Sequence, residues 1–300
     1  MGLTSTLVIV NPAAGRGQAV HVWTRVSARV PHLKEVECVT TEAPGHARRL
    51  AHAAATRGVE RVVAVGGDGT VSEVAGGLAG SQVALGVVPA GTGNDFSRAL
   101  GLPSAPEIAA RLALDGSTRW VDLGHVRTAH QRVAFVNVAG CGFDAEVVRR
   151  TRSGRRAGGA LMYLIGILQT LTAFRPVPMG LVVDGQWLER RALGIAVAIG
   201  PRYGGGMLVA PQAVLDDGLF DVCLIGDINP LQLLALLPRL YAGTHGGHHA
   251  VQFFRCRELT VEPLAAADVS CQADGELLDK LPATFGIQPR ALLCVTGQRK

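Results

Sequence analysis

Several features that would assign a function at once are missing from this chain of 300 residues. Its six cysteines never form a Cys-x-x-Cys spacing, which excludes the usual zinc and dithiol motifs, and most of them lie in apolar runs typical of buried strands. Only 5% of the residues are aromatic, and no basic stripe is interleaved with them, so we expect no nucleic-acid partner. The apolar run at 160–174 is shorter than the roughly 20 residues that span a bilayer.

The standard nucleotide-binding fingerprints are absent as well. No Gly-x-x-x-x-Gly-Lys-[Ser/Thr] occurs, and "GRGQAV" lacks the third glycine of the dinucleotide-binding pattern. The start of the chain, "MGLTSTLVIVNP", has no charge before a run of only four apolar residues, so we expect no signal peptide and a cytoplasmic protein. The net charge of +5 favours phosphate-rich ligands or an anionic membrane surface.

The residues that are present indicate a globular protein with two differently built halves. Hydrophobic residues make up 48% of the chain and charged residues 18%. From residue 7 to about 124, short strand-like runs alternate with helical patterns, which is typical of an α/β domain with a parallel sheet. Beyond residue 124, closely spaced strand candidates with helical stretches only near 157–174 and 229–241 predict a β-sandwich or barrel carrying two helices. The strand candidates are 133–138, 181–183, 187–199, 207–214, 219–225, 257–262, 269–273, 283–288 and 291–296, with Asp184-Gly185 and Asp274-Gly275 as hairpin turns.

The stretch "VVAVGGDGTVSE", residues 62–73, places glycines where a ligand or a sharp turn would need them. They follow a continuously apolar strand and precede a helix, and open α/β sheets bind ligands at such carboxyl ends of strands. Glycine lets backbone N–H groups approach a phosphate, and the helix N-terminus favours its charge. An acid beside a phosphate is repelled unless a divalent cation lies between them, so we interpret Asp68 as a ligand of Mg²⁺ or of its water. A tight turn with Asp68 capping the helix is the alternative.

Two neighbouring loops favour the ligand interpretation. Asn11–Gly15 follows the first predicted strand and Gly91–Asp95 follows the fourth. Each loop alone fits an ordinary turn, but three loops at one edge of a sheet indicate a nucleotide site. Thr41 ends the second strand, where a helix cap and a ligand contact are equally compatible with the sequence. The side-chain donors in these loops are Thr70, Thr92 and Asn94.

Taken in order, "NPAAG", "GGDGT", "PAGTGNDF", "DDGLFDV" and a late "DGE" resemble the motifs of the diacylglycerol kinase catalytic domain family, which includes bacterial lipid kinases and sphingosine kinases. The resemblance runs from about Leu7 to Glu276. It implies a nucleotide-binding α/β domain at 1–124, a β-sandwich lipid-substrate domain at 125–288, ATP in the cleft between them, and a strand at about 289–300 that returns to the first domain. Two alternatives stay open, a NAD kinase, which shares "GGDGT", and a catalytically silent nucleotide-binding regulator. The chain has no Asn-Glu dipeptide, a motif of NAD kinases, and the intact Asp68 and Glu276 argue against a silent protein.

The resemblance also implies roles for individual residues. Asp68 and Asp95 would belong to the Mg²⁺ and water network near the γ-phosphate, and Glu276 would accept the proton of the lipid hydroxyl. From the residues alone, an acid just after Asp-Gly is more often a solvated turn residue. A second, structural Mg²⁺ would bind Asp217 and the backbone carbonyls of Val214 and Leu219. The implied ATP contacts are Asn11, Pro12, Ala13, Ala14, Gly15, Thr41, Gly66, Gly67, Asp68, Gly69, Thr70, Val71, Ser72 and Thr92.

The expected partner is a lipid alcohol, with diacylglycerol ahead of sphingoid bases and other lipid alcohols. Five arginines within 149–156, followed by the apolar run at 160–174, suggest transient contact with an anionic membrane surface, each arginine contributing about 1 kcal/mol. A solvated arginine-rich loop before a core helix explains the same residues. We therefore expect a cytoplasmic protein that is peripheral at the inner membrane surface, and we leave a homodimer open.

Overall fold

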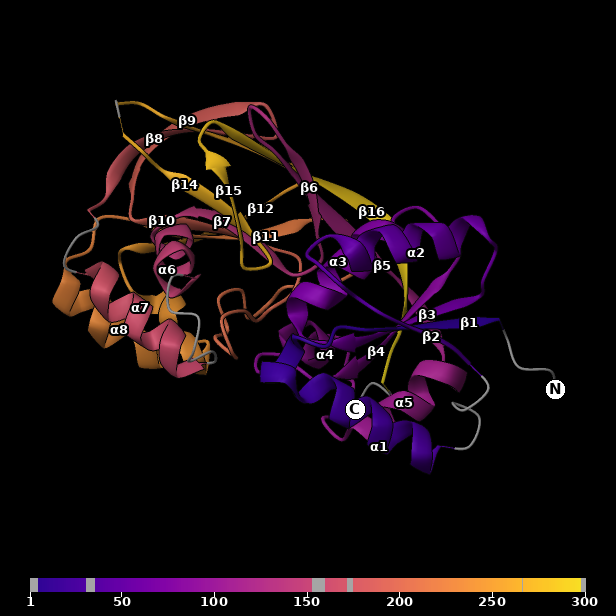
Figure 1. Cartoon of the computed structure of the whole chain (residues 1–300). Helices are drawn as coiled ribbons and strands as arrows, with labels where there is room; N and C mark the ends of the chain where they lie inside the picture. The colour runs from indigo at the N-terminus through magenta and orange to yellow at the C-terminus, as the bar shows by residue number, and fades with distance from the viewer. Residues whose placement is uncertain (1–4, 31–35, 153–159, 172–174, 266, 298–300) are drawn as a thin grey trace. The chain divides into compact units, whose positions relative to one another are not determined.

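The computed structural model describes residues 5–30, 36–152, 160–171, 175–265 and 267–297 (Figure 1). The chain divides into two compact units, which we call the first unit, Met1–Leu123 with Arg290–Lys300, and the second unit, Gly124–Pro289. Two long strands contain the boundaries between them. These are β5, Thr118–Arg127, and β16, Ala283–Val295.

The first unit is built on a parallel sheet with helices on both faces. Its strands lie in the order β2, β1, β3, β4, and the end of β16 pairs with β4 in parallel at Cys294 and Leu85. Strand β3 is buried from Val62 to Gly66, which explains its unbroken apolar sequence. The strands are β1 Thr6–Val10, β2 Glu37–Thr40, β3 Arg61–Gly66 and β4 Ala84–Pro89.

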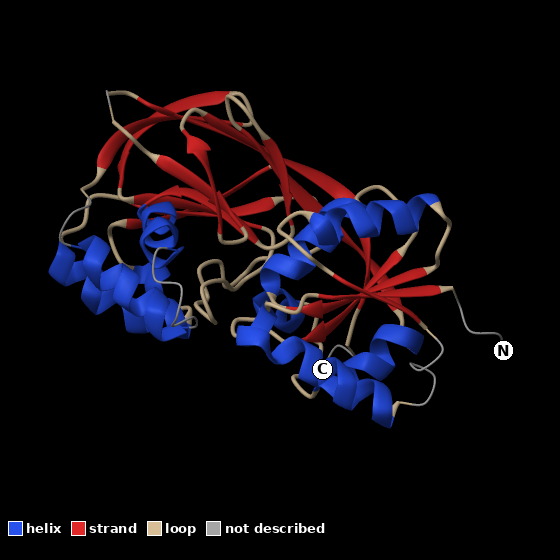
Figure 2. Ribbon diagram, viewed as in Figure 1, coloured by secondary structure: helices blue, strands red, loops and turns tan. Residues whose placement is uncertain are grey.

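Helices α2 and α3 cover one face of this sheet, and α1 and α5 cover the other (Figures 1 and 2). The backbones of α2 and α3 approach closely at Gly77. A Cβ added to this glycine would lie 2.4 Å from the Arg48 carbonyl oxygen. Helix α5 has a proline as its first residue, where the missing N–H costs no hydrogen bond. The helical segments are η1 Ala14–Gly17, α1 Gln18–Arg29, α2 His46–Thr56, α3 Asp68–Leu78, α4 Asp95–Ala99 and α5 Pro106–Asp115.

The second unit stacks antiparallel sheets, with three helices against one of them (Figure 2). A six-stranded sheet has the order β12, β11, β10, β7, β14, β15, and β16, β13, β8 and β9 lie next to one another in that order with antiparallel pairing. Its strands are β6 Arg132–Phe135, β7 Val138–Gly142, β8 Val177–Val183, β9 Gln186–Ala192, β10 Gly194–Ala198, β11 Phe220–Ile225, β12 Val251–Cys256, β13 Glu258–Pro263, β14 Ser270–Ala273 and β15 Glu276–Lys280. Its helical segments are α6 Phe143–Arg152, α7 Ala160–Leu171, α8 Pro230–Ala242 and η3 His245–Gly247.

The predicted fold class is confirmed, a parallel α/β part followed by an antiparallel β-sandwich. Both predicted hairpins are present, since Asp184-Gly185 joins β8 to β9 and Asp274-Gly275 joins β14 to β15. The two aspartates have φ values of 46° and 47°, the left-handed region that such two-residue turns require. None of the helices in the described part of the chain combines the length and the apolar character that crossing a bilayer requires.

Several local predictions are wrong. Residues 207–214 form no strand but bends, because Pro211 interrupts any ladder and a single bridge joins Tyr203 to Met207. The run 187–199 is two strands in different sheets, and the candidates 283–288 and 291–296 are one strand, β16. Part of the arginine-rich stretch is helical, since α6 extends to Arg152, and 153–159 lie outside the described residues.

Candidate functional site

The carboxyl ends of β1, β3 and β4 bring their three loops into contact. The Asn11 side chain donates a hydrogen bond from Nδ2 to Thr70 Oγ1 at 2.9 Å, which ties the loop after β1 to the start of α3. A Cβ on Gly91 would lie 2.4 Å from the Cα of Gly67, so the loops after β3 and β4 meet backbone to backbone. Gly15 has a φ of 58°, and a Cβ there would lie 2.1 Å from the Ala90 carbonyl oxygen. Only glycine fits these positions, because a side chain would force the loops apart.

Asp68 is the first residue of α3, but its carboxylate does not cap that helix. Gly67 stands at the N-cap position without a side-chain cap. Instead, Asp68 Oδ1 accepts the backbone N–H of Phe96 at 3.1 Å, at the start of α4 in the next loop. Burial raises the pKa of the Asp68 carboxyl above its ordinary value, the charge of Asp95 raises it further, and the backbone amides of 94–96 oppose both effects.

A second carboxylate, that of Asp95, lies beside the first. It is 3% exposed, and its Oδ1 accepts a hydrogen bond from Arg98 Nη1 at 2.6 Å. A Cβ on Gly93 would lie 2.7 Å from Asp68 Oδ2 and 3.6 Å from Asp95 Oδ2, so both oxygens lie close to this glycine. Mg²⁺ is commonly bound by one or two carboxylates together with water and substrate phosphates. In the described part of the chain no group of three acidic, histidine or cysteine side chains could hold a metal alone.

The other predicted ATP contacts differ in their exposure and in whether their backbone N–H groups already have partners. Pro12, Ala13 and Thr92 are exposed, and Ala14 is half-buried. The N–H of Ala13 already donates to Asn11 Oδ1 at 3.0 Å. Five predicted contacts are buried, namely Thr41, Gly66, Thr70, Val71 and Ser72, and the N–H of Val71 donates to Gly67 O within the first turn of α3. The glycines at 66, 67 and 69 and the hydroxyl of Thr70 lie at that same turn.

The loop predicted to hold a structural Mg²⁺ contains a contact between an aspartate and an arginine. Asp217 Oδ1 accepts the N–H of Leu219 at 3.1 Å, and its Oδ2 accepts a hydrogen bond from Arg255. The same guanidinium lies 3.6 Å from Asp221, a buried carboxylate. Val214 is exposed at the start of this loop. Both oxygens of Asp217 therefore have partners, and this arrangement favours an internal ion pair over a bound cation, so metal binding by Val214, Asp217 and Leu219 stays a prediction.

Glu276, the predicted proton acceptor, is the first residue of β15 and is half-buried. Two residues hold the turn before it, Asp274, which the sequence marked only as part of a hairpin, and Gln272, which it did not mark. Asp274 accepts the backbone N–H groups of 136–138 at 2.8, 3.0 and 3.2 Å. Gln272 Oε1 accepts the N–H of Gly275 at 2.9 Å. Only the Asp-Gly pair signalled this turn in the sequence, since the partners of Asp274 lie more than a hundred residues away.

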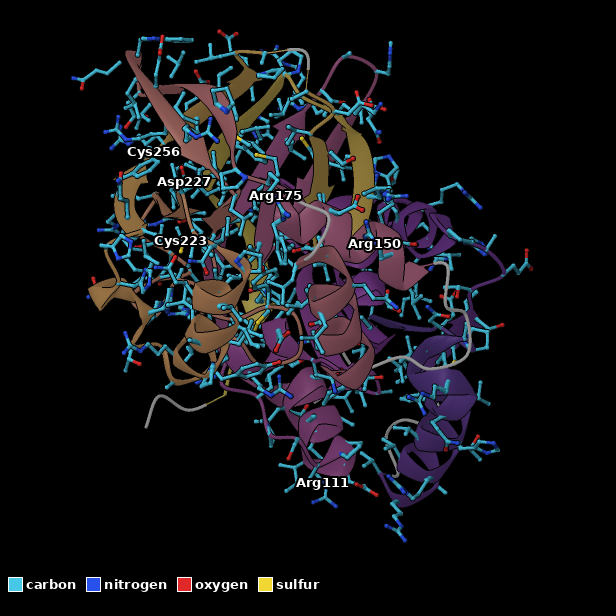
Figure 3. The ribbon with its side chains drawn as sticks, turned by 90° about the vertical axis from the view of Figure 1, so that its left-hand side faces the viewer. Arg111, Arg150, Arg175, Cys223, Asp227 and Cys256 are labelled. Atoms are coloured by element: carbon cyan, nitrogen blue, oxygen red, sulfur yellow. The ribbon has the colours of Figure 1, made fainter. Side chains whose placement is uncertain are left out.

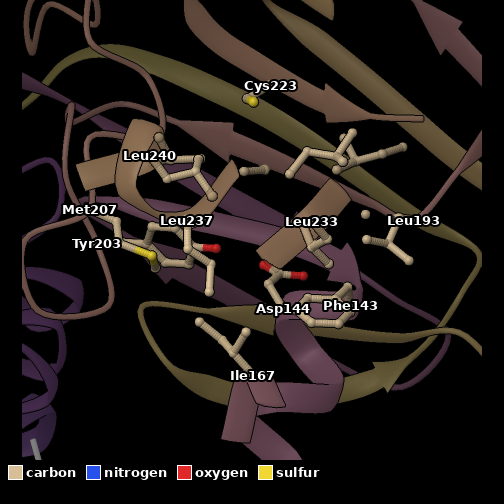
Figure 4. Close-up of a pocket in the computed structure, with 15 residues that line it drawn as sticks. Phe143, Asp144, Ile167, Leu193, Tyr203, Met207, Cys223, Leu233, Leu237 and Leu240 are labelled. Carbon is tan, nitrogen blue, oxygen red and sulfur yellow. The ribbon is translucent and has the colours of Figure 1, made fainter. Parts of the chain in front are cut away.

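The second unit contains a small apolar cavity of about 50 Å³ between its six-stranded sheet and its helices (Figure 4). Leu233, Leu237 and Leu240 of α8 line it, together with Ile167 of α7. Asp144 is its one charged lining residue in the described part of the chain, and burial raises the pKa of its carboxyl to about 6.

The predicted membrane-facing arginines are partly neutralised within α6. Arg149 and Arg150 both donate to Glu146, at 2.6 and 2.7 Å (Figure 3 labels Arg150). Pairs at this spacing are ordinary features of exposed helices and contribute a few tenths of a kcal/mol. Two of the five arginines therefore carry less free charge than the sequence suggests.

Comparison with known proteins gives matches over both units. Residues 5–126 match the diacylglycerol kinase catalytic domain, and residues 137–296 match the YegS C-terminal NAD kinase beta sandwich-like domain. The chain is 36% identical over 289 residues to a diacylglycerol kinase of Mycobacterium tuberculosis, covering 95% of this chain and 92% of that protein. It is 34% identical to a probable lipid kinase YegS-like of Pseudomonas aeruginosa, covering 89% and 86%. A crystal structure of a putative diacylglycerol kinase from Bacillus anthracis has the same fold, with a TM-score of 0.80 over 99% of both chains at 23% identity.

Proposed function

The chain belongs to the diacylglycerol kinase family with its YegS-like lipid kinases, and from this premise we propose that it transfers the γ-phosphate of ATP to the hydroxyl of a lipid alcohol, with diacylglycerol as the first candidate. One observation carries the nucleotide half of this proposal. It is the pair of carboxylates, Asp68 and Asp95, held at the meeting point of glycine-rich loops. Buried like charges are costly unless a cation accompanies them, and ATP brings Mg²⁺ with its phosphates.

Each loop has a part in binding the nucleotide. The glycines at 66, 67 and 69 let backbone N–H groups approach the phosphates at the N-terminus of α3. Asp68 and Asp95 would hold Mg²⁺, which when bound neutralises charge on the phosphates. Arg98 fixes the orientation of Asp95 through its 2.6 Å contact. The amides at the start of α4 fix Asp68 in turn.

The lipid hydroxyl supplies the nucleophile, and Glu276 takes its proton. The lipid oxygen forms a bond to the γ-phosphorus while the bond from that phosphorus to the bridging oxygen breaks, which leaves ADP. A carboxylate is a weak base for a free alcohol, so Glu276 orients the hydroxyl and accepts the proton late in the transfer. The turn contacts of Asp274 keep this residue at a defined place on β15.

The apolar cavity of the second unit supports a lipid substrate over a soluble one such as NAD. Burying there the part of a chain that fits would gain about 0.8 kcal/mol for each methylene removed from water. A NAD molecule would bring hydroxyls and phosphates into the cavity, and its lining leucines, Leu233, Leu237 and Leu240, cannot hydrogen-bond to them.

The test is a transfer assay with labelled ATP, Mg²⁺ and either diacylglycerol in mixed micelles or NAD. We expect labelled lipid and no labelled NAD. Label on NAD alone would show a NAD kinase, and ATP binding without transfer to either would show a regulator. We expect the Asp68→Ala and Glu276→Ala substitutions to abolish turnover. Both variants should still unfold cooperatively on heating, as folded proteins do. Retention of more than about a tenth of wild-type kcat, equivalent to roughly 1.4 kcal/mol of lost stabilisation, would refute the role of that residue.

A further inference from the structure

A line of buried hydrogen bonds runs from the apolar cavity to the hairpin of Glu276. Gln272 Nε2 donates to Asp144 Oδ2 at 2.9 Å, and Asp144 lines the cavity (Figure 4). At its other end, Gln272 Oε1 accepts the N–H of Gly275 at 2.9 Å, and Gly275 directly precedes Glu276. Gln272 is 1% exposed and Asp144 7% exposed, so water does not replace these contacts.

The surrounding backbone is shaped for this line of contacts. The register places Gln272 opposite Gly140 on β7 and opposite Leu277 on β15. A Cβ on Gly140 would lie 2.6 Å from Asp144 Oδ2, so the missing side chain leaves the space that this carboxylate occupies. The second oxygen of Asp144 accepts the N–H of Ala145 at 2.8 Å. Glutamine suits the middle position because its side chain ends in one donor and one acceptor, and both are used.

The hairpin has two anchors of different kinds. Asp274 ties it to backbone amides at 136–138, a contact that involves no residue of the cavity wall. Gln272 ties it to Asp144, which does belong to that wall. Of the two anchors, only the Gln272 anchor therefore contacts a residue of the cavity wall.

We propose that Gln272 is a positioning residue that couples a lipid chain in the cavity to the placement of Glu276. The proposal rests on the proposed function, with the cavity as the chain site and Glu276 as the proton acceptor. A chain in the cavity packs against the wall that contains Asp144 and restricts its motion, and the two hydrogen bonds of Gln272 pass this restriction to the Gly275 backbone. Binding energy from a remote part of the substrate is then expressed in kcat, because it orients the reacting group.

The experiment measures kcat and KM for long-chain and short-chain diacylglycerols in mixed micelles at saturating ATP. We expect wild-type kcat to fall about tenfold from long to short chains, the loss that enzymes show when remote binding energy is removed. In Gln272→Leu we expect kcat on the long chain to fall about tenfold, with little further loss on the short chain and an unchanged KM for ATP. In the Gln272→Leu variant, the length of the lipid chain then affects mainly the KM for the lipid.

A polarity exchange tests the pair itself. Gln272→Glu alone places two carboxylates against each other and lowers kcat. Adding Asp144→Asn lets the new amide donate to the new carboxylate, while the acceptors for the Ala145 and Gly275 N–H groups are retained. We expect this double variant to recover kcat to within about threefold of wild type and to restore the chain-length dependence of kcat.

The matched control is Asp279→Asn on the same strand as Glu276. Its carboxylate accepts from Thr128 at 2.7 Å and has no part in the line from the cavity. We expect wild-type chain-length dependence in this variant, and thermal unfolding of every variant reports loss of fold. If Gln272→Leu does not unfold cooperatively, the proposal is tested by comparing the kcat of Gln272→Glu with that of the double variant.

Two results would overturn the proposal. One is a folded Gln272→Leu protein whose kcat keeps the wild-type dependence on chain length, and the other is a double variant no better than Gln272→Glu. A wild-type protein that phosphorylates no lipid would instead overturn the proposed function, and this proposal with it.

Discussion

Replacing Gly93 by alanine tests the Asp68 carboxylate without changing any charged group. The added Cβ would lie 2.7 Å from Asp68 Oδ2, whereas ordinary contact begins at 3.4 Å. The φ of Gly93 lies outside the left-handed region, so alanine adds no backbone strain. The substitution therefore acts mainly on the position of one carboxylate.

The size of the effect follows from this distance. The carboxylate must move by about 0.7 Å to restore ordinary contact, and a misplacement of about 1 Å costs on the order of 100-fold in rate. The same shift would lengthen the 3.1 Å contact between Phe96 N and Asp68 Oδ1 beyond hydrogen-bond range. We therefore expect kcat to fall about 10- to 100-fold. We expect the free energy of unfolding to fall by only about 1 kcal/mol, the contribution of one hydrogen bond.

The assay is lipid phosphorylation at varied Mg²⁺ and ATP, with thermal unfolding of the same preparations. Gly247→Ala is the control, since no atom lies within 4 Å of a Cβ at that position and its φ also lies outside the left-handed region. We expect Gly93→Ala to need more Mg²⁺ for half-maximal rate and Gly247→Ala to match wild type. A Gly93→Ala protein with kcat within twofold of wild type and an unchanged Mg²⁺ requirement would refute the placement of Asp68 beside the phosphates.

Three further predictions concern stability. Because burial raises the pKa of Asp144 from 3.8 to about 6, its ionised form is disfavoured in the folded state. Its contribution to stability should therefore decrease as pH rises through this interval, by up to about 3 kcal/mol, and urea unfolding should show that wild type loses more stability over the interval than Asp144→Asn. Arg255→Met should lower the free energy of unfolding by about 1 kcal/mol, since Asp217 and the buried Asp221 lose their cation. Mg²⁺ without nucleotide should then raise the Tm of this variant and leave the wild-type Tm unchanged, and a rise in wild type would show that the loop binds metal. Glu73→Ala should lower stability by about 1 to 2 kcal/mol in denaturant titrations, because its carboxylate accepts two backbone N–H groups at the start of α2; an unchanged midpoint would refute this capping role.

Much of the fold could be predicted because its signals are local. The unbroken apolar run of β3 indicates a strand buried on both faces, and the Asp-Gly pairs at 184 and 274 indicate tight hairpins. Helix α6 was missed because its arginines suggested a solvated loop before a core helix. The course of β16, antiparallel to β13 and parallel to β4, depends on partners far away in the sequence and leaves no local pattern.

The candidate site, too, has features that the sequence predicts and features that depend on partners far away in the chain. The order of strands and glycine-rich loops predicted which loops should meet, and the structure brings them together. The hydrogen-bond partners could not be predicted, since Phe96 is 28 residues from Asp68 and Arg255 is 38 from Asp217. A helix cap within α3 was the nearest local explanation for Asp68, and the fold uses its carboxylate elsewhere.

The carboxylates of Asp68 and Asp95 have different partners among the described residues. Asp95 has Arg98 at 2.6 Å, whereas the pKa of Asp68 is lowered there by the backbone amides of 94–96 and by no cationic side chain. Because its pKa is raised, ionised Asp68 destabilises the free protein relative to a neutral residue of the same shape. A fold selected for stability alone would not retain this arrangement. The positive charge would arrive with a ligand in the function that we propose, because a cation bound to phosphate is a ligand that two carboxylates and an edge of glycine amides can share.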